Sequence, residues 1–256
     1  RAGIFRPQRH WRNSPAWRSA GQRRTPVSFE RLKKWFRKSS GSPWYSPAEL
    51  ALLRSHVNRY FGTVQSVYRG IAPHEFPVDI WEIPPTPEHP YRLWATCGMG
   101  TWRMNVPDNA VCSRIELLIA LPPDWKTDRL DELDWGWPFN VLKFLADYPA
   151  ARHTYLGYGH VVVNDGGALA PSTRLSGVIL ECPYEYPPEA WECMLNPSGH
   201  ILFLQVVPLY PEELEYKRVH GTAALETLLG ETFSMVVDPV RRNCAIWQST
   251  RENAAE

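Results

Sequence analysis

The chain has 256 residues, of which 44% are hydrophobic and 21% charged, and its formal net charge is +1. This length supports a core of its own and excludes a small scaffold that depends on disulfides. The five cysteines are odd in number and form no C-x-x-C pair, so neither a disulfide framework nor a thiolate zinc site is expected. No apolar run approaches the length of a membrane span, about 18 residues, so we expect a cytoplasmic protein with reduced thiols.

The near-zero net charge conceals two oppositely charged parts. Residues 1–40 hold twelve Lys or Arg and one acid, Glu30, for a net charge of +11, whereas the other 216 residues carry −10. Segment 1–42 is poor in aliphatic residues and interrupted by prolines, so it cannot offset the entropy of ordering. We predict a disordered basic tail over 1–42, a folded domain over 43–248 and a flexible end over 249–256. The tail is compatible with binding nucleic acid or an anionic surface, with a transit peptide, or with a leader of no separate role.

The folded part begins with a predicted helix over 46–62. Ser46 can cap it, Pro47 occupies its first turn and Glu49 completes a capping box. Alternating and continuous apolar runs predict strands, and amphipathic runs predict helices. The predicted strands cover 78–83, 92–97, 114–121, 159–164, 174–181 and 200–210, and the further helices cover 138–149, 211–221 and 222–230. Because there is no regular βα repeat, we predict an α+β fold with a mixed, largely antiparallel sheet packed with helices.

The stretch TCGMGTWRMNVP, residues 96–107, begins like a phosphate-binding loop. Gly98 and Gly100 give G-x-G, but Arg103 stands at the third glycine position and no helix follows. Nucleotide binding is therefore not expected. Cys97 resembles a nucleophile only if a histidine lies near it in space, and a cysteine at a strand end is more often a small core residue.

Histidines supply the other chemical candidates. The sequence HEFPV at 74–78 lacks the second histidine of a zinc protease and carries Pro77 inside the required turn, and no pair of histidines has ligand spacing. No metal and no cofactor is predicted. His160 lies at the start of a predicted strand and Asp165 follows it, so a hydrolase using His160 with Asp165 or Cys97 is one hypothesis. No G-x-S-x-G elbow accompanies them, which favours a structural, hydrogen-bonding histidine.

Six segments together resemble a known family. In chain order they are PPTPEHPYRLWATCGMGTWRMNVP, RIELLIALPPDW, WPFNVLKFLADYP, GYGH, LQVVPLYPEELEYKRVHG and VVDPVRRNC. Their order and intervals resemble the bacterial Suppressor of fused-like domain over about residues 45–246. The resemblance implies a single domain of the short bacterial form that acts as a protein-binding module, without enzyme activity or cofactor.

The resemblance also suggests a partner. In animals the related domain holds a transcription factor in Hedgehog signalling, whereas bacterial members look like immunity proteins that neutralise polymorphic toxins. An acidic domain suits a nuclease toxin, because a surface that holds phosphates is basic and attracts it. The residues expected to contact the partner are aromatic or arginine side chains in loop-like surroundings: Trp102, Arg103, Trp125, Trp135 and Trp137. A regulatory protein of Suppressor of fused type and the hydrolase remain the alternatives.

Overall fold

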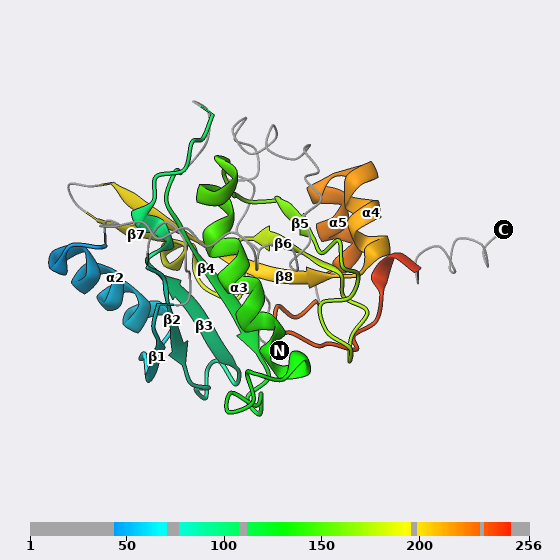
Figure 1. Ribbon diagram of the computed structural model, residues 1–256, viewed down its shortest axis with the longest axis horizontal. Helices are drawn as coiled ribbons and strands as arrows, with labels where there is room; N and C mark the ends of the chain where they lie inside the picture. Colours follow the sequence, from blue (N-terminus) through cyan, green and yellow to red (C-terminus); the bar gives the residue numbers. More distant parts are fainter. Residues whose placement is uncertain (1–43, 71–76, 108–111, 196–198, 231–232, 247–256) are drawn as a thin grey trace.

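A computed structural model describes residues 44–70, 77–107, 112–195, 199–230 and 233–246 (Figure 1). The predicted tails over 1–42 and 249–256 lie outside the described residues. The described part forms one mixed sheet with helices packed on it, which confirms the predicted α+β fold.

The sheet has the strand order β1-β2-β3-β4-β8-β6-β5, and β7 also pairs with β8. The strands are β1 (Ser66–Tyr68), β2 (Asp79–Ile83), β3 (Arg92–Cys97), β4 (Ile115–Leu121), β5 (Val161–Val163), β6 (Gly177–Glu181), β7 (Glu192–Met194) and β8 (His200–Leu209). β4 and β8 run parallel, and the other paired strands run antiparallel. The amino ends of β4 and β8 therefore lie at the same end of the sheet as the carboxyl ends of β3 and β6.

Helices cover both faces of this sheet. They are α2 (Pro47–Tyr60), α3 (Leu133–Arg152), α4 (Pro211–His220) and α5 (Thr222–Leu229), and α3 lies across the sheet in Figure 1. Phe139 of α3 packs against Trp94 of β3. On the opposite face, His56 of α2 stacks on Phe203 of β8, and α4 and α5 cover Val207 farther along the same strand. Phe203 and Val207 share this face because side chains alternate along a strand.

The core follows from this arrangement. One large apolar cluster includes the buried side chains of the sheet, those of α2 on one face and those of α3 on the other. A smaller cluster lies under α4 and α5 and consists of Ile179, Val207, Leu209, Leu214 and Leu225. β4 is buried along its whole length, as its continuous apolar run predicts.

Most predicted elements appear close to their predicted bounds, and the differences have local causes. The capping box of Ser46 and Glu49 on α2 is confirmed. α3 is longer than predicted because it continues through Pro138 and Pro149. Each proline removes one backbone bond, and the buried side chains around them keep the helix continuous. The strands β1 and β7 were not predicted.

His56 gives the fold a pH dependence. Its imidazole Nε2 lies 2.8 Å from the Ala190 carbonyl oxygen, and its ring stacks on Phe203 with centroids 5.5 Å apart. Burial lowers the pKa of His56 below its ordinary value of 6.5.

The unfolded chain takes up this proton near pH 6.5, whereas the folded protein resists it until the pH is lower. The contribution of neutral His56 to the stability of the fold is therefore complete above pH 6.5. It is lost as the pH falls toward the lowered pKa of His56 in the folded state. We expect urea denaturation to give a smaller loss of stability between pH 7 and 5 in His56→Gln than in the wild type. An unchanged slope in His56→Gln would refute the assignment.

Candidate functional site

The glycine-containing turn after β3 encloses a buried carboxylate. Glu116 of β4 has no exposed surface. One of its oxygens accepts hydrogen bonds from the Tyr45 hydroxyl at 2.6 Å and from the amides of Gly98 and Gly100 at 2.9 and 3.0 Å. The other accepts from the Thr96 hydroxyl at 2.5 Å. Burial raises the pKa of Glu116, while these hydrogen bonds act in the opposite direction.

The two glycines are needed for this close approach. Gly98 has φ of +123°, and a side chain there would meet the Pro77 carbonyl oxygen at 2.4 Å. A Cβ at Gly100 would come within 2.4 Å of the Tyr45 hydroxyl. Backbone amides that hold a phosphate in a nucleotide loop thus hold the protein's own carboxylate here.

Arg114 ties the same turn to α2. Its Nε donates to the Gly100 carbonyl at 2.6 Å, and its Nη2 lies 3.3 Å from Glu49 in the first turn of α2. The guanidinium also lies over the Tyr45 ring, 5.7 Å from its centroid. Arg114 is itself 5% exposed, so the base of the turn is fixed from both sides.

The turn leads directly to Trp102 and Arg103. Trp102 is partly buried and packs against the large core cluster, and Arg103 is exposed. The Met104 sulfur then accepts a hydrogen bond from the Leu156 amide at 3.3 Å. A rigid base therefore presents Trp102 and Arg103 beside the loop that follows α3.

The other three predicted contact residues form a tryptophan cluster, with Trp125 in the loop after β4 and Trp135 and Trp137 near the start of α3. The Trp125 ring lies edge-on to Trp135 and Trp137, with centroids 5.1 and 6.2 Å away. Its indole nitrogen donates to the Trp135 carbonyl at 2.9 Å. Trp125 and Trp137 are only 5% and 3% exposed, so they lie in the core and offer little surface to a partner. Trp135 is half-buried and carries the Arg129 guanidinium over its ring.

The tryptophan cluster supports an acidic loop over residues 122–132. Asp124, Asp128, Asp131 and Glu132 of this loop are exposed. The loop follows the carboxyl end of β4, whereas the Trp102–Arg103 segment lies beside the amino end of the same strand. The predicted contact residues therefore fall into two groups at opposite ends of the sheet.

The residues of the hydrolase hypothesis do not come together. His160 precedes β5 and Asp165 follows it, so an extended chain separates them by about 16 Å. The His160 ring instead packs on Tyr155, with centroids 4.9 Å apart. Cys97 is fully buried, and burial, followed by the charge of Glu116, raises the pKa of its thiol well above the ordinary range. Cys97 ends β3, which lies four strands away from β5 in the sheet order, so the geometry supports neither pairing of the hypothesis.

The described residues also hold polar clusters that sequence reasoning missed. Near His160, the hydroxyls of Tyr158 and Tyr184 both donate to the same carboxylate oxygen of Glu226. Burial raises the pKa of both tyrosines, so they remain protonated donors. Within the described ranges, no three His, Cys, Asp or Glu side chains converge as metal ligands do. None of the described helices has both the length and the apolar character that crossing a membrane requires.

Fold and site together define a mixed α+β domain whose Glu116 network fixes the shape of a loop. Similar folds occur in a SUFU homologue from Neisseria gonorrhoeae FA 1090 (TM-score 0.51, 17% identity, 78% of this chain and 96% of that one) and in Drosophila Suppressor of Fused (0.56, 15%, 83% and 55%). A chain in the crystal structure of a Sufu–Fu complex gives 0.55 at 15% identity, with 84% and 97% covered.

The sequence comparisons agree with the fold. An uncharacterised protein of Ureaplasma parvum serovar 3 is 22% identical over 200 residues, which are 78% of this chain and 96% of that protein. The family model described as Suppressor of fused protein (SUFU) matches residues 74–242. The chain belongs to the SUFU family, which confirms the resemblance seen in the sequence.

Proposed function

We propose that the protein is a non-enzymatic binding module, an immunity protein that neutralises a cognate toxin by binding it. Membership of the SUFU family carries the proposal, and the relative in the Sufu–Fu structure is a protein captured with another protein. The net charge of −10 outside residues 1–40 supports a basic partner such as a nuclease, because opposite charges accelerate encounter. All five cysteines are free thiols, which supports a cytoplasmic location.

The proposed contact surface is the segment Trp102–Arg103. Tryptophan and arginine are the residue types that most often dominate binding energy. The Glu116 and Arg114 contacts hold the preceding turn, so little conformational entropy is lost when a partner binds. Trp135 and the acidic loop at the other end of the sheet form a second proposed contact region.

Replacing Arg103 by alanine tests the proposed surface. We expect affinity for the toxin-like product of an adjacent gene, measured by calorimetry, to fall about 30-fold or more, since a central arginine contributes about 2 kcal/mol or more. Growth rescue on co-expression should weaken in parallel.

Arg69→Ala is the matched control, because Arg69 is also exposed but lies after β1 at the sheet edge. Its affinity should stay within about twofold of the wild type. If no adjacent gene product forms a complex on gel filtration and none is neutralised, the immunity role is refuted.

A regulatory role of Suppressor of fused type is the second candidate, favoured by the relative in the Sufu–Fu structure. It predicts a stable complex with a partner that is not toxic to the cell. Co-expression then gives a complex and no growth rescue, which separates the two roles.

A further inference from the structure

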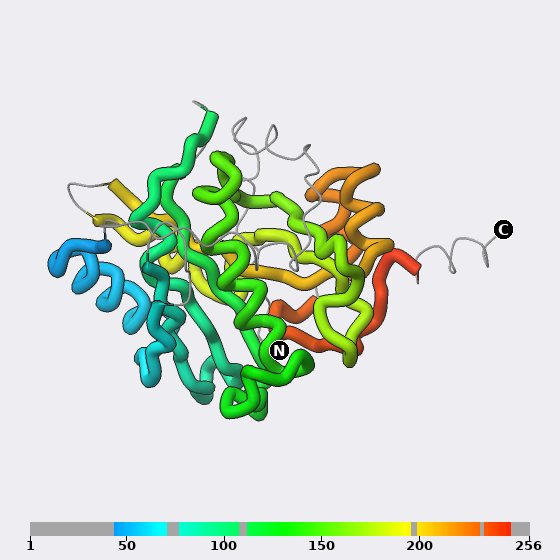
Figure 2. Tube along the Cα trace, in the orientation of Figure 1, coloured from blue at the N-terminus to red at the C-terminus, as the bar shows by residue number. Residues whose placement is uncertain are grey.

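The C-terminal segment 233–246, called the strap below, lies where two central strands separate. The parallel ladder of β4 and β8 ends at the pair Leu118 and Gln205. Beyond it, Ala120 of β4 forms a parallel bridge with Val236 of the strap, and the Val237 amide donates to the Ala120 carbonyl at 2.8 Å. The strap thus satisfies backbone groups at the point where β8 leaves β4. Figure 2 shows it in red, passing toward the side of the molecule that carries α4 and α5.

An arginine and a buried glutamate fasten the far end of the strap. Arg241 Nη1 donates to Glu213 Oε1 at 2.7 Å, Nη2 pairs with Oε2, and Nη2 also donates to the Pro208 carbonyl at 3.0 Å. The guanidinium lies over the rings of Tyr210 and Phe233, 4.9 and 5.1 Å from their centroids. A bidentate arginine–carboxylate pair whose guanidinium also stacks on aromatic rings requires a specific geometry.

Glu213 links this fastening to α4. Its side chain is fully buried and also accepts from the Tyr210 amide at 3.0 Å, before the first turn of α4, and from the Cys244 amide at 2.9 Å. One carboxylate therefore joins the strap to the start of the helix. The helix dipole alone favours acidic residues in the first turn of α4. Glu213 has a further role there, because it also binds the strap.

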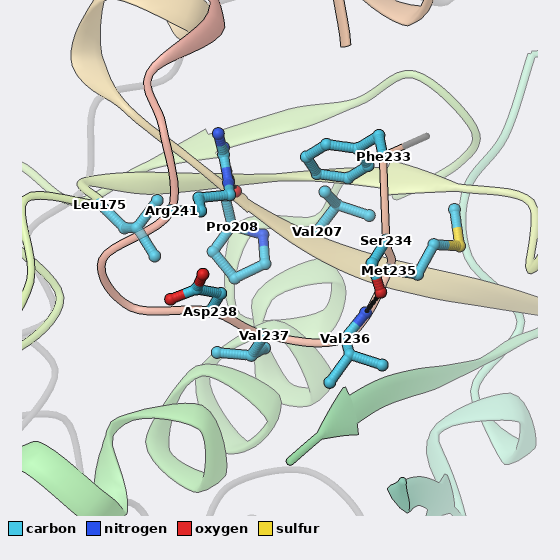
Figure 3. Close-up of a pocket in the computed structure, with 10 residues that line it drawn as sticks. All are labelled: Leu175, Val207, Pro208, Phe233, Ser234, Met235, Val236, Val237, Asp238 and Arg241. Atoms are coloured by element: carbon cyan, nitrogen blue, oxygen red, sulfur yellow. Dashed lines mark hydrogen bonds between the residues drawn. The ribbon is translucent and has the colours of Figure 1, made fainter. Parts of the chain in front are cut away.

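The seam between strap and sheet is nearly closed. A pocket there is lined by Leu175, Val207, Pro208, Phe233, Ser234, Met235, Val236, Val237, Asp238 and Arg241 (Figure 3). Its volume is about 10 Å³, the room of about one water molecule, so it is no cofactor site. Phe233 and Met235 pack on the small core cluster, whereas Val236 and Val237 belong to the large one.

We propose that the strap opens and closes as one unit, with Arg241 and Glu213 as its latch. The strap is held by the bridge to Ala120, by the latch and by single hydrogen bonds with Thr173 and Glu185, and the described strand pairings of β1 to β8 do not involve it. Opening exposes the apolar surface of Leu175 and Val207 and the Ala120 carbonyl. The structure shows the closed state, in which the strap occupies this slot.

Hydrogen exchange of the full chain by NMR tests the proposal through three amides: Val237, Cys244 and, as the reference, Leu202, which donates to the Arg114 carbonyl. Val237 and Cys244 should exchange through one common opening that is faster than exchange at Leu202 and depends less on denaturant. In Arg241→Lys, exchange at Val237 and Cys244 should rise by the same factor, about tenfold or more.

Tyr210→Phe, which removes the hydroxyl bond to the Arg241 carbonyl, should act in the same direction more weakly and serves if Arg241→Lys fails to fold. Arg218→Lys, which alters an exposed pair with Glu215 on α4, should leave exchange at both strap amides unchanged. A rise at Cys244 without one at Val237 would indicate local fraying and overturn the proposal. Exchange at Val237 and Cys244 with the same rate and denaturant dependence as Leu202 would overturn it as well.

Discussion

Glu116→Ala is expected to lower the free energy of unfolding by about 3–5 kcal/mol. The substitution leaves the hydroxyls of Tyr45 and Thr96 and the amides of Gly98 and Gly100 without their acceptor, in a place that has no exposed surface. A buried donor that loses its partner costs more than an average hydrogen bond contributes. Urea denaturation followed by circular dichroism measures the change.

Two comparisons make this result specific. Glu116→Gln keeps the shape, but its NH₂ group cannot accept, so we expect an intermediate loss of about 2 kcal/mol. Glu88→Ala, at an exposed position, should change stability by no more than about 0.5 kcal/mol. A loss of less than about 1 kcal/mol in Glu116→Ala would mean that the donors find other partners, and the turn would then not depend on this carboxylate.

The same substitution connects stability with the proposed function. Trp102 and Arg103 follow the turn that Glu116 holds, so a loosened turn raises the entropy lost on binding. Glu116→Ala should therefore weaken toxin binding even in the fraction of molecules that remain folded. Arg103→Ala should weaken binding with a smaller loss of stability than Glu116→Ala, because Arg103 is exposed.

Strands β3 and β4 could be predicted from sequence because each is a run of mostly apolar residues long enough to indicate a strand by itself. β3 begins and ends where its sequence pattern predicts, and β4 differs by one residue. β1 and β7 have three residues each, and their conformation depends on distant partners, such as Ile201 opposite Cys193. A run of three residues carries too little periodicity to indicate a strand.

The candidate site was located by sequence, but its organising residue was missed. The stretch 96–107 attracted attention for its glycines, whereas the carboxylate they surround stands 16 positions beyond Gly100. A signal was present, because Glu116 interrupts an otherwise apolar run, and a charged residue in a strand buried on both faces needs hydrogen-bond partners. The identity of those partners depends on pairing between β3 and β4.

The C-terminal signature shows the same limit. VVDPVRRNC carries part of the family resemblance, but nothing in its letters indicates that Arg241 reaches Glu213, which lies 28 positions earlier. For His160 and Asp165, closeness in sequence wrongly suggested closeness in space. They are close in sequence, but the strand between them is extended and carries them to opposite ends of β5.

Trp125→Ala is expected to cost about 3–5 kcal/mol of stability, because removal of a buried aromatic ring leaves a cavity. The ring is 5% exposed, contacts Trp135 and Trp137, and donates its indole hydrogen to the Trp135 carbonyl. Thermal denaturation and urea titration measure the loss. Trp137→Ala should behave in the same way, since that side chain is 3% exposed.

Trp135→Ala provides the contrast that separates support from contact. Trp135 is half-buried, so its removal should cost about 1–2 kcal/mol of stability, less than the removal of Trp125. If the acidic loop contacts a basic partner, Trp135→Ala should lower affinity more than its stability loss accounts for, and the effect should weaken as salt is added. If Trp135→Ala binds the partner with the affinity of the wild type, this end of the sheet is not part of the interface. The contact would then rest on Trp102 and Arg103 alone.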